Sequence, residues 1–137
     1  MPALSYKGRF VEYVEAGLKP QRNGKRIKRQ SIRNFRKYPV KPGDTLYHYF
    51  AQRTKFCRKL GESICESAEK IIIREKSITF FSRVLGSKPV KCNYRSLVML
   101  DAFAIADGFE NWREMKLWWK LTHGPDCFPF VGQLIKW

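Results

Sequence analysis

Hydrophobic residues in the first half of the chain recur at two spacings, one typical of a helix and one typical of strands. Phe10 and Val14 stand one helical turn apart within residues 9–16, and Gly17 is a natural helix end. Residues 45–50, TLYHYF, are β-branched or aromatic at most positions and indicate a strand that follows a turn at residues 41–44. Further short strands are predicted at residues 4–6 and 30–33.

The second half of the chain begins with strand patterns and then changes to helical ones. Residues 71–73 are three successive isoleucines, as in a strand that is buried on both faces. Asn111 is a predicted helix N-cap with Glu114 as its capping partner, and Gly124 can end that helix. The predicted elements are strands at 63–74 and 77–81, an irregular edge at 82–94, helices from 97 to about 108 and from 111 to 124, and a last strand at 128–137 broken at Gly132.

These elements predict an α+β protein with five to seven strands and about three helices. We expect one domain over residues 1–137, because no repeat or low-complexity linker divides the chain. The short, mostly antiparallel strands favour a small closed sheet, that is, a β-barrel.

The net charge changes this picture, because it points to a polyanion as partner. The chain has 27 Lys and Arg against 12 Asp and Glu, for a net charge of +15. Residues 1–95 carry 23 basic and 7 acidic side chains (+16), whereas residues 96–137 carry 4 and 5 (−1). Such an uneven excess favours nucleic acid as the partner over a basic surface that serves solubility only.

Two basic segments are candidates for binding phosphates. Residues 19–41 hold ten Lys or Arg and no acidic residue, and residues 53–61 form a second cluster, RTKFCRKLG. Arg33 follows an apolar residue in a predicted strand, so we expect it to face a polar cleft, where it can hold a phosphate or a base edge. The other predicted phosphate contacts are Arg26, Lys28, Arg29, Arg36, Lys37, Arg53, Lys55, Arg58 and Lys59.

Aromatic and metal-binding candidates are fewer. Tyr47 and Tyr49 share one strand face and either stack on bases or belong to the core. The two histidines and four cysteines have no zinc-type spacing, so we expect neither a metal nor another cofactor. No apolar run is long enough to span a membrane, residues 1–10 lack the apolar core of a signal peptide, and the scattered cysteines are typical of a reduced cytoplasmic protein. Nothing indicates an obligate oligomer.

Several motifs, in this order, resemble the ASCH family, which has a PUA-like β-barrel fold. They are Gly17-x-Lys19, Gln30-Ser31-Ile32-Arg33, Lys41-Pro42-Gly43-Asp44-Thr45-Leu46, the RTKFCRKLG segment, Asp107-Gly108-Phe109, Glu114-Met115 and Gly132-Gln133-Leu134-Ile135-Lys136-Trp137. The resemblance covers nearly the whole chain and is closest to members from bacteria and bacteriophages. It implies RNA binding and a location in the cytoplasm, which is that of the host if the protein is phage-encoded.

Some ASCH members resemble amidohydrolases that remove an acyl group from a modified cytidine, and others are reported as ribonucleases. Their Lys-x-x-Thr-Ile-Arg motif, with a later carboxylate, implies Lys19, Ser31 and Asp107 as catalytic residues here. This chain departs from the motif, because residues 22–29 then form a basic insertion, Ser replaces Thr, and the shorter Asp replaces Glu.

The sequence therefore supports two main hypotheses. In the first, the protein is an RNA-binding module that grips phosphates with its basic face and takes a base or modified nucleoside into a cleft lined by Lys19, Ser31 and Arg33. In the second, it is a ribonuclease or a cytidine-type amidohydrolase that uses Lys19, Ser31 and Asp107. A weaker third possibility is an adaptor that binds an acidic protein.

Overall fold

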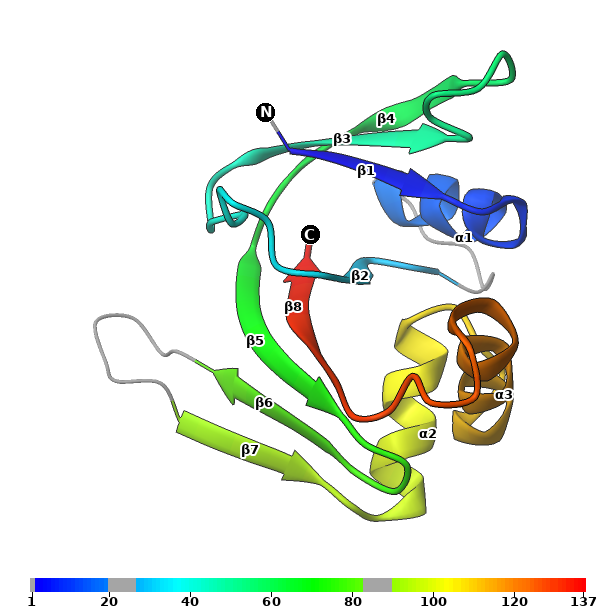
Figure 1. Cartoon of the computed structure of the whole chain (residues 1–137). Coiled ribbons are helices and arrows are strands. Elements are labelled where there is room, and N and C mark those ends of the chain that lie inside the picture. The colour runs from blue at the N-terminus through cyan, green and yellow to red at the C-terminus, as the bar shows by residue number, and fades with distance from the viewer. Residues whose placement is uncertain (1, 20–26, 83–89) are drawn as a thin grey trace.

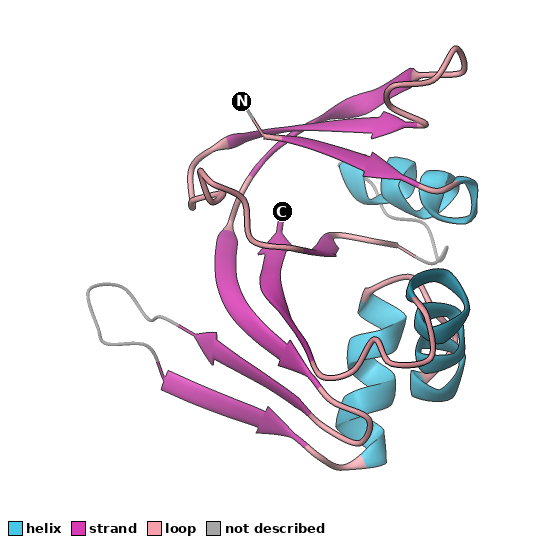
Figure 2. Cartoon of the chain, viewed as in Figure 1, coloured by secondary structure: helices cyan, strands magenta, loops and turns pink. Residues whose placement is uncertain are grey.

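The computed structural model describes residues 2–19, 27–82 and 90–137, and it has the α+β class predicted from the sequence. Its described part contains three helices and two mostly antiparallel sheets (Figures 1 and 2). The strands are β1 (Ala3–Tyr6), β2 (Gln30–Arg33), β3 (Thr45–Phe50), β4 (Arg58–Ile64), β5 (Ser67–Ile73), β6 (Ile78–Ser82), β7 (Val90–Tyr94) and β8 (Phe130–Lys136). The helices are α1 (Gly8–Leu18), α2 (Leu97–Ala106) and α3 (Trp112–His123).

The smaller sheet has the order β1-β3-β4, in which β1 runs parallel to β3 and β3 pairs antiparallel with β4. The β3–β4 ladder shifts register between His48 and Tyr49, so that Leu60 is an extra residue between Lys59 and Gly61. Gly61 lies inside β4 at this bulge, with a φ of 153°. Its positive φ explains the glycine, since bulges often require a backbone conformation that side chains disfavour.

The larger sheet has the order β2-β8-β5-β6-β7, and all of its pairings are antiparallel. The predicted break at Gly132 is wrong, because β8 runs without interruption and Gly132 pairs with Ile71. A Cβ at Gly132 would lie 2.4 Å from the carbonyl oxygen of Arg33. This glycine is therefore needed for the close approach of β2, the strand that carries Ser31 and Arg33.

The predicted strand over residues 63–74 is in fact two strands. The chain leaves β4 after Ile64 and enters β5 at Ser67, so it passes from one sheet to the other at this point (Figure 1). The two sheets are not joined into a closed barrel in the described part of the chain. Periodicity cannot distinguish one long strand from two that change sheets, because both alternate in the same way.

Helices α2 and α3 pack together beside one end of the larger sheet, and α1 packs against β4 (Figure 1). The Asn111 side chain accepts a hydrogen bond from the backbone N–H of Glu114 at 2.8 Å, which confirms the predicted N-cap of α3. Glu114 in turn accepts from the backbone N–H of Glu110 at 3.2 Å, one residue earlier than in a standard capping box.

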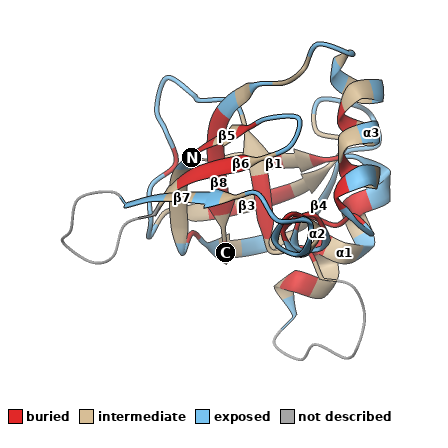
Figure 3. Cartoon of the chain, turned by 90° about the horizontal axis from the view of Figure 1, so that it is seen from below, coloured by how far each residue is buried: buried red, intermediate tan, exposed pale blue. Residues whose placement is uncertain are grey.

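The core lies between these layers and is formed by Ile, Leu, Phe and Trp side chains from both sheets and all three helices. Figure 3 shows the buried positions on the inner strands and on the helix sides that face them. No helix in the described ranges is long and apolar enough to cross a membrane.

Candidate functional site

A cavity of about 440 Å³ opens where β1, β2 and the start of α1 meet α3 and the end of α2. One part of its wall is polar, with Tyr6, Lys28, Ser31, Arg33 and Asp107. The aromatic part of the wall is formed by Phe10, Trp118, Trp119 and Phe130. A mostly apolar cavity with a few converging polar groups is the usual form of a small-molecule or nucleoside site.

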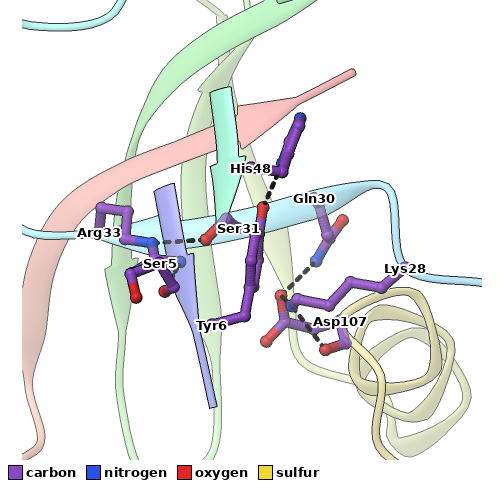
Figure 4. A network of polar contacts seen from close by, with 8 residues as sticks. All are labelled: Ser5, Tyr6, Lys28, Gln30, Ser31, Arg33, His48 and Asp107. Carbon is purple, nitrogen blue, oxygen red and sulfur yellow. Dashed lines mark hydrogen bonds and ion pairs between the residues drawn. The ribbon is translucent and has the colours of Figure 1, made fainter. Parts of the chain in front are cut away.

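The polar wall contains a buried ion pair. Lys28 donates from Nζ to Asp107 Oδ1 at 2.9 Å and to the Asp107 carbonyl oxygen at 2.7 Å. The two residues are only 4% and 5% exposed. Gln30 also donates to Asp107 Oδ1, at 3.4 Å (Figure 4). The ammonium group of Lys28 lies 4.9 Å from the centre of the Phe10 ring, so one side of it faces an aromatic surface.

Local backbone structure places both partners of this pair. Asp107 is the C-cap of α2, and its N–H bonds to the carbonyl oxygens of the last turn. Gly108 follows with a φ of 97°, and a Cβ there would lie 3.1 Å from the Phe10 ring. The Lys28 backbone N–H donates to the carbonyl of Tyr13 in α1 at 3.0 Å. Gly17 permits this contact, because a Cβ at that position would be 2.3 Å from the Lys28 carbonyl oxygen.

Burial pushes both members of the pair toward their neutral forms. Desolvation lowers the pKa of Lys28, and the Asp107 carboxylate opposes that shift. Desolvation likewise raises the pKa of Asp107, against the charge of Lys28 and the hydrogen bonds from Lys28 and Gln30. Because the pKa of the lysine falls and that of the aspartate rises, the two pKa values are closer together than those of free Lys and Asp side chains in water. Transfer of a proton from Lys28 to Asp107 therefore costs less here.

Ser31 and Arg33 lie on the same side of β2 and contact each other. Arg33 donates from Nε to Ser31 Oγ at 2.6 Å and from Nη2 to the carbonyl oxygen of Ser5 at 2.8 Å. Its guanidinium carbon is 5.1 Å from the centre of the Tyr6 ring. The Ser31 oxygen therefore accepts a charge-assisted hydrogen bond, and its own hydrogen remains available to another acceptor. The structure places Arg33 in the cavity wall, where the sequence predicted a polar cleft.

The structure brings Ser31 and Asp107 to one cavity but not Lys19. Lys19 is the exposed C-cap of α1 and is not in the cavity wall, whereas Lys28 is. A signal for Lys28 was present in the sequence, because Lys28-Arg29-Gln30-Ser31-Ile32-Arg33 has the spacing of Lys-x-x-Thr-Ile-Arg without an insertion. The earlier interpretation of residues 22–29 as inserted concealed this spacing.

The predicted phosphate contacts have diverse surroundings. Lys28 is buried and does not belong to an exposed basic face. Its ammonium group pairs with Asp107, as a charge removed from water requires. Arg29 pairs with Glu66, Arg58 with Glu15 and Lys59 with Glu62, and Arg36 donates to the carbonyl of Ala3. Lys37, Arg53 and Lys55 are exposed, and Arg26 lies outside the described residues.

The predicted stacking residues do not lie at the cavity. Tyr47 and Tyr49 alternate with the buried Leu46 and His48, so they occupy the outer face of β3 and are half-buried. The ammonium group of Lys59 is 5.3 Å from the centre of the Tyr47 ring. Aromatic side chains at the cavity come instead from other elements, and they include Trp118 and Trp119 of α3.

Trp119 also offers an unused hydrogen-bond donor. It is 5% exposed, and its indole N–H has no partner among the residues that the structure describes. A buried donor without a partner costs free energy unless a ligand or a water molecule satisfies it. This feature suits a ligand with an acceptor group.

Within the described ranges, no group of three or more His, Cys, Asp or Glu side chains is placed to hold a metal ion. No family model, curated protein or solved structure matches this chain. The functional interpretation therefore depends on the geometry of the cavity and on the motifs of the sequence.

Proposed function

We propose that the protein is a hydrolase that admits one nucleobase-sized group into the cavity and cleaves an amide bond on it. The observation that carries this proposal is the buried Lys28–Asp107 pair in the same cavity wall as Ser31, whose oxygen Arg33 holds at 2.6 Å. Buried ion pairs contribute little to stability compared with apolar replacements, so their presence in a cavity favours a functional role.

The proposed reaction uses these side chains in sequence. Lys28 becomes neutral by passing a proton to Asp107. It then takes the hydrogen of the Ser31 hydroxyl, and Ser31 Oγ attacks the carbonyl carbon of the amide. The carbon–nitrogen bond then breaks, and the proton passes from the Lys28–Asp107 pair to the departing amine. A water molecule, deprotonated by the same pair, hydrolyses the acyl-serine to a carboxylic acid and restores the hydroxyl. Arg33 stabilises negative charge on the oxygen of Ser31.

The cavity wall and the sequence motif together support the substrate class. A cavity of about 440 Å³ with Trp118 and Trp119 in its wall has the size and the aromatic surface that a single base requires. Lys28-x-x-Ser31-Ile32-Arg33 resembles the motif of the amidohydrolase-like ASCH members. We therefore propose that the substrate is an N4-acylated cytidine. We also propose that the chain is a member of the ASCH family, with a PUA-like barrel that is open between its two sheets.

The test is release of cytidine from N4-acetylcytidine, followed by chromatography. We expect Ser31→Ala and Lys28→Ala to lower kcat by at least about a hundredfold. Lys19→Ala is the matched control and should leave turnover unchanged, because Lys19 is exposed and outside the cavity wall. Lys28→Ala removes a buried charge, so this variant can fail to fold. In that case the kcat of Ser31→Ala decides the test. An inactive wild-type protein, or loss of activity in Lys19→Ala alone, would contradict the proposal.

A second candidate function is binding of single-stranded nucleic acid, RNA before DNA. The observation that favours it is the exposed segment of residues 53–59, which lies in the β3–β4 connection and the first two residues of β4 and includes four Lys or Arg and one aromatic residue, Phe56. Phe56 is 66% exposed, with the ammonium group of Lys55 5.1 Å from the centre of its ring. Cations beside an exposed aromatic ring suit a single-stranded nucleic acid, because its bases can stack on the ring and the cations can neutralise its phosphates. Binding that weakens steeply as salt increases would support this function.

A further inference from the structure

A second chain of hydrogen bonds begins at the cavity and leads away from it through β1, β3 and β4. The Tyr6 hydroxyl lies 2.9 Å from His48 Nδ1, and His48 Nε2 lies 2.7 Å from Ser63 Oγ. Tyr6 is 4% exposed and His48 is fully buried. Figure 4 shows the Tyr6 ring with Ser31 and Arg33 on one side, Lys28 and Asp107 on the other, and His48 at its hydroxyl.

Tyr6 also belongs to the cavity wall, so its hydroxyl connects this chain to the proposed nucleophile. Ser31 and Arg33 belong to the same wall, and the Arg33 guanidinium carbon is 5.1 Å from the centre of the Tyr6 ring. The Tyr6 ring is fixed in place, because it stacks on the His48 ring at 5.8 Å between centroids and packs against Trp137 at 6.2 Å. A hydroxyl on a fixed ring can change the direction of its hydrogen but hardly its position.

His48 and Tyr6 are both neutral at physiological pH. Burial, with a contribution from the charge of Arg33, lowers the pKa of His48 to about 4. Burial raises the pKa of Tyr6 far above its ordinary value, although Arg33 opposes that shift. The His48 ring therefore carries one hydrogen, on either Nδ1 or Nε2.

The position of that hydrogen decides what Tyr6 can do at the cavity. When it is on Nε2, Ser63 accepts it, and Tyr6 must donate its hydroxyl hydrogen to Nδ1. When it is on Nδ1, it is donated to the Tyr6 oxygen, Ser63 donates to Nε2, and the Tyr6 hydrogen is free to point toward the cavity. Both arrangements satisfy His48, because a serine hydroxyl can donate or accept.

We propose that Tyr6 is a further catalytic residue, whose hydroxyl donates a hydrogen bond to the oxyanion that forms when Ser31 attacks the amide. His48 and Ser63 are positioning residues that direct the Tyr6 hydrogen toward the cavity when the His48 hydrogen is on Nδ1. This inference rests on the hydrolase function proposed above. It fits the requirement that an oxyanion donor be fixed close to the nucleophile before the reaction begins.

Tyr6→Phe tests the role of the hydroxyl and keeps the ring. We expect kcat for N4-acetylcytidine to fall by about a hundredfold to a thousandfold, the range for loss of one oxyanion donor, with KM changed less than about threefold. Tyr38→Phe is the matched control, because it removes the same hydroxyl from a residue that is 80% exposed. If the hydroxyl had only a structural role, Tyr6→Phe would not lower kcat by this factor while leaving KM nearly unchanged.

Nitrogen-15 NMR of the imidazole rings tests the relay without measuring turnover. The chain has two histidines, so the spectrum of His123→Gln assigns the signals of His48. In Ser63→Ala, Nε2 loses its partner, and an unpaired N–H costs more than an unpaired acceptor, so the hydrogen should move to Nδ1. In Tyr6→Phe, Nδ1 faces a ring without a polar atom, and the hydrogen should be on Nε2.

The outcomes separate this inference from the function on which it rests. A wild-type protein that releases no cytidine overturns both. An active wild type with a Tyr6→Phe variant that keeps kcat within threefold overturns the role of Tyr6 alone. Identical His48 signals in Ser63→Ala and Tyr6→Phe overturn the relay, even if Tyr6→Phe is inactive.

Discussion

Lys28 and Asp107 show at the residue scale how much the site depends on paired charges. Each is nearly inaccessible to water, and each has the other as its charged partner. The pair therefore behaves as one unit, because a single buried charge without a partner is much more costly than the pair or than two apolar residues.

We predict that Lys28→Met lowers the free energy of unfolding by about 3 kcal/mol or more, because it leaves the Asp107 carboxylate buried alone. The double variant Lys28→Met, Asp107→Leu should recover most of that loss. Urea denaturation at neutral pH measures both effects. Arg58→Met is the matched control, since it breaks the exposed pair with Glu15 and should cost less than about 1 kcal/mol. Additive losses in the double variant would contradict the prediction.

His48 provides a residue-scale prediction about pH. Its pKa is about 4 in the folded protein and about 6.5 in an unfolded chain, so the unfolded state binds the proton first as pH falls. The contribution of neutral His48 to stability is therefore complete above about pH 6.5 and is lost as pH falls toward 4. Between about pH 7.5 and 4.5 we expect a loss of about 2 to 3 kcal/mol from this residue.

Urea denaturation of wild type and His48→Asn at the two pH values isolates the effect of His48. The variant should lose less stability than the wild type over this range. His123→Gln should differ from the wild type by a smaller amount, because His123 is exposed and the desolvation that lowers its pKa is only partial. Equal acid sensitivity in wild type and His48→Asn would show that His48 is not buried in its neutral form.

At the scale of elements, the contact between α1 and the segment that leads into β2 positions Lys28. The Lys28 backbone N–H bonds to α1 at Tyr13, and Gly17 lies directly against the Lys28 carbonyl. Gly17 is thus more than the helix end predicted from the sequence, since α1 continues past it to Leu18. Its missing side chain lets two elements approach closely enough to bury the lysine.

We predict that Gly17→Ala destabilises the protein by about 1 to 3 kcal/mol and lowers turnover, because the new methyl group would force residues 27–29 away from α1. Gly8→Ala, at the other end of α1, is the matched control. Its Cβ would meet only the Phe50 ring at 3.8 Å, so this variant should be neutral or slightly more stable. Thermal denaturation and the cytidine assay compare the two. Equal stability of the two variants would mean that the α1 contact does not position Lys28.

At the scale of the whole molecule, the charge excess and the cavity are separate features. The cavity wall contains Lys7, Lys28 and Arg33, whereas the exposed cations at residues 53–59 lie in the β3–β4 connection and at the start of β4 in the smaller sheet. Long-range attraction of a polyanion by the excess charge can therefore act without occupying the cavity.

We predict that affinity for a single-stranded RNA, measured by fluorescence anisotropy, falls linearly on a log–log plot against salt. The double variant Arg53→Gln, Lys55→Gln should lower that slope by about 1.4, since each phosphate contact contributes about 0.7. The matched control is Lys116→Gln, Lys120→Gln, which removes the same charge from two lysines that pair with Glu75. Equal slopes for the two double variants would assign binding to net charge rather than to the β3–β4 connection.

The sequence by itself determined most of the elements and the class of fold. β2 and β3 have the predicted bounds, and the caps of α3 are at the predicted residues, because strand alternation, helix spacing and capping are local properties. Ser31, Arg33 and Asp107 were also identified before the structure, through the order of the motifs and the expected direction of Arg33.

Only the tertiary structure decided which lysine joins them and how the sheets are arranged. Lys28 and Asp107 are 79 residues apart, and their contact depends on the pairing of β2 with β8 and on the packing of α1 against residues 27–29. Tyr6 and His48 likewise meet because β1 pairs with β3. Such contacts follow from register and packing between distant segments, which the spacing of residues along one segment does not specify.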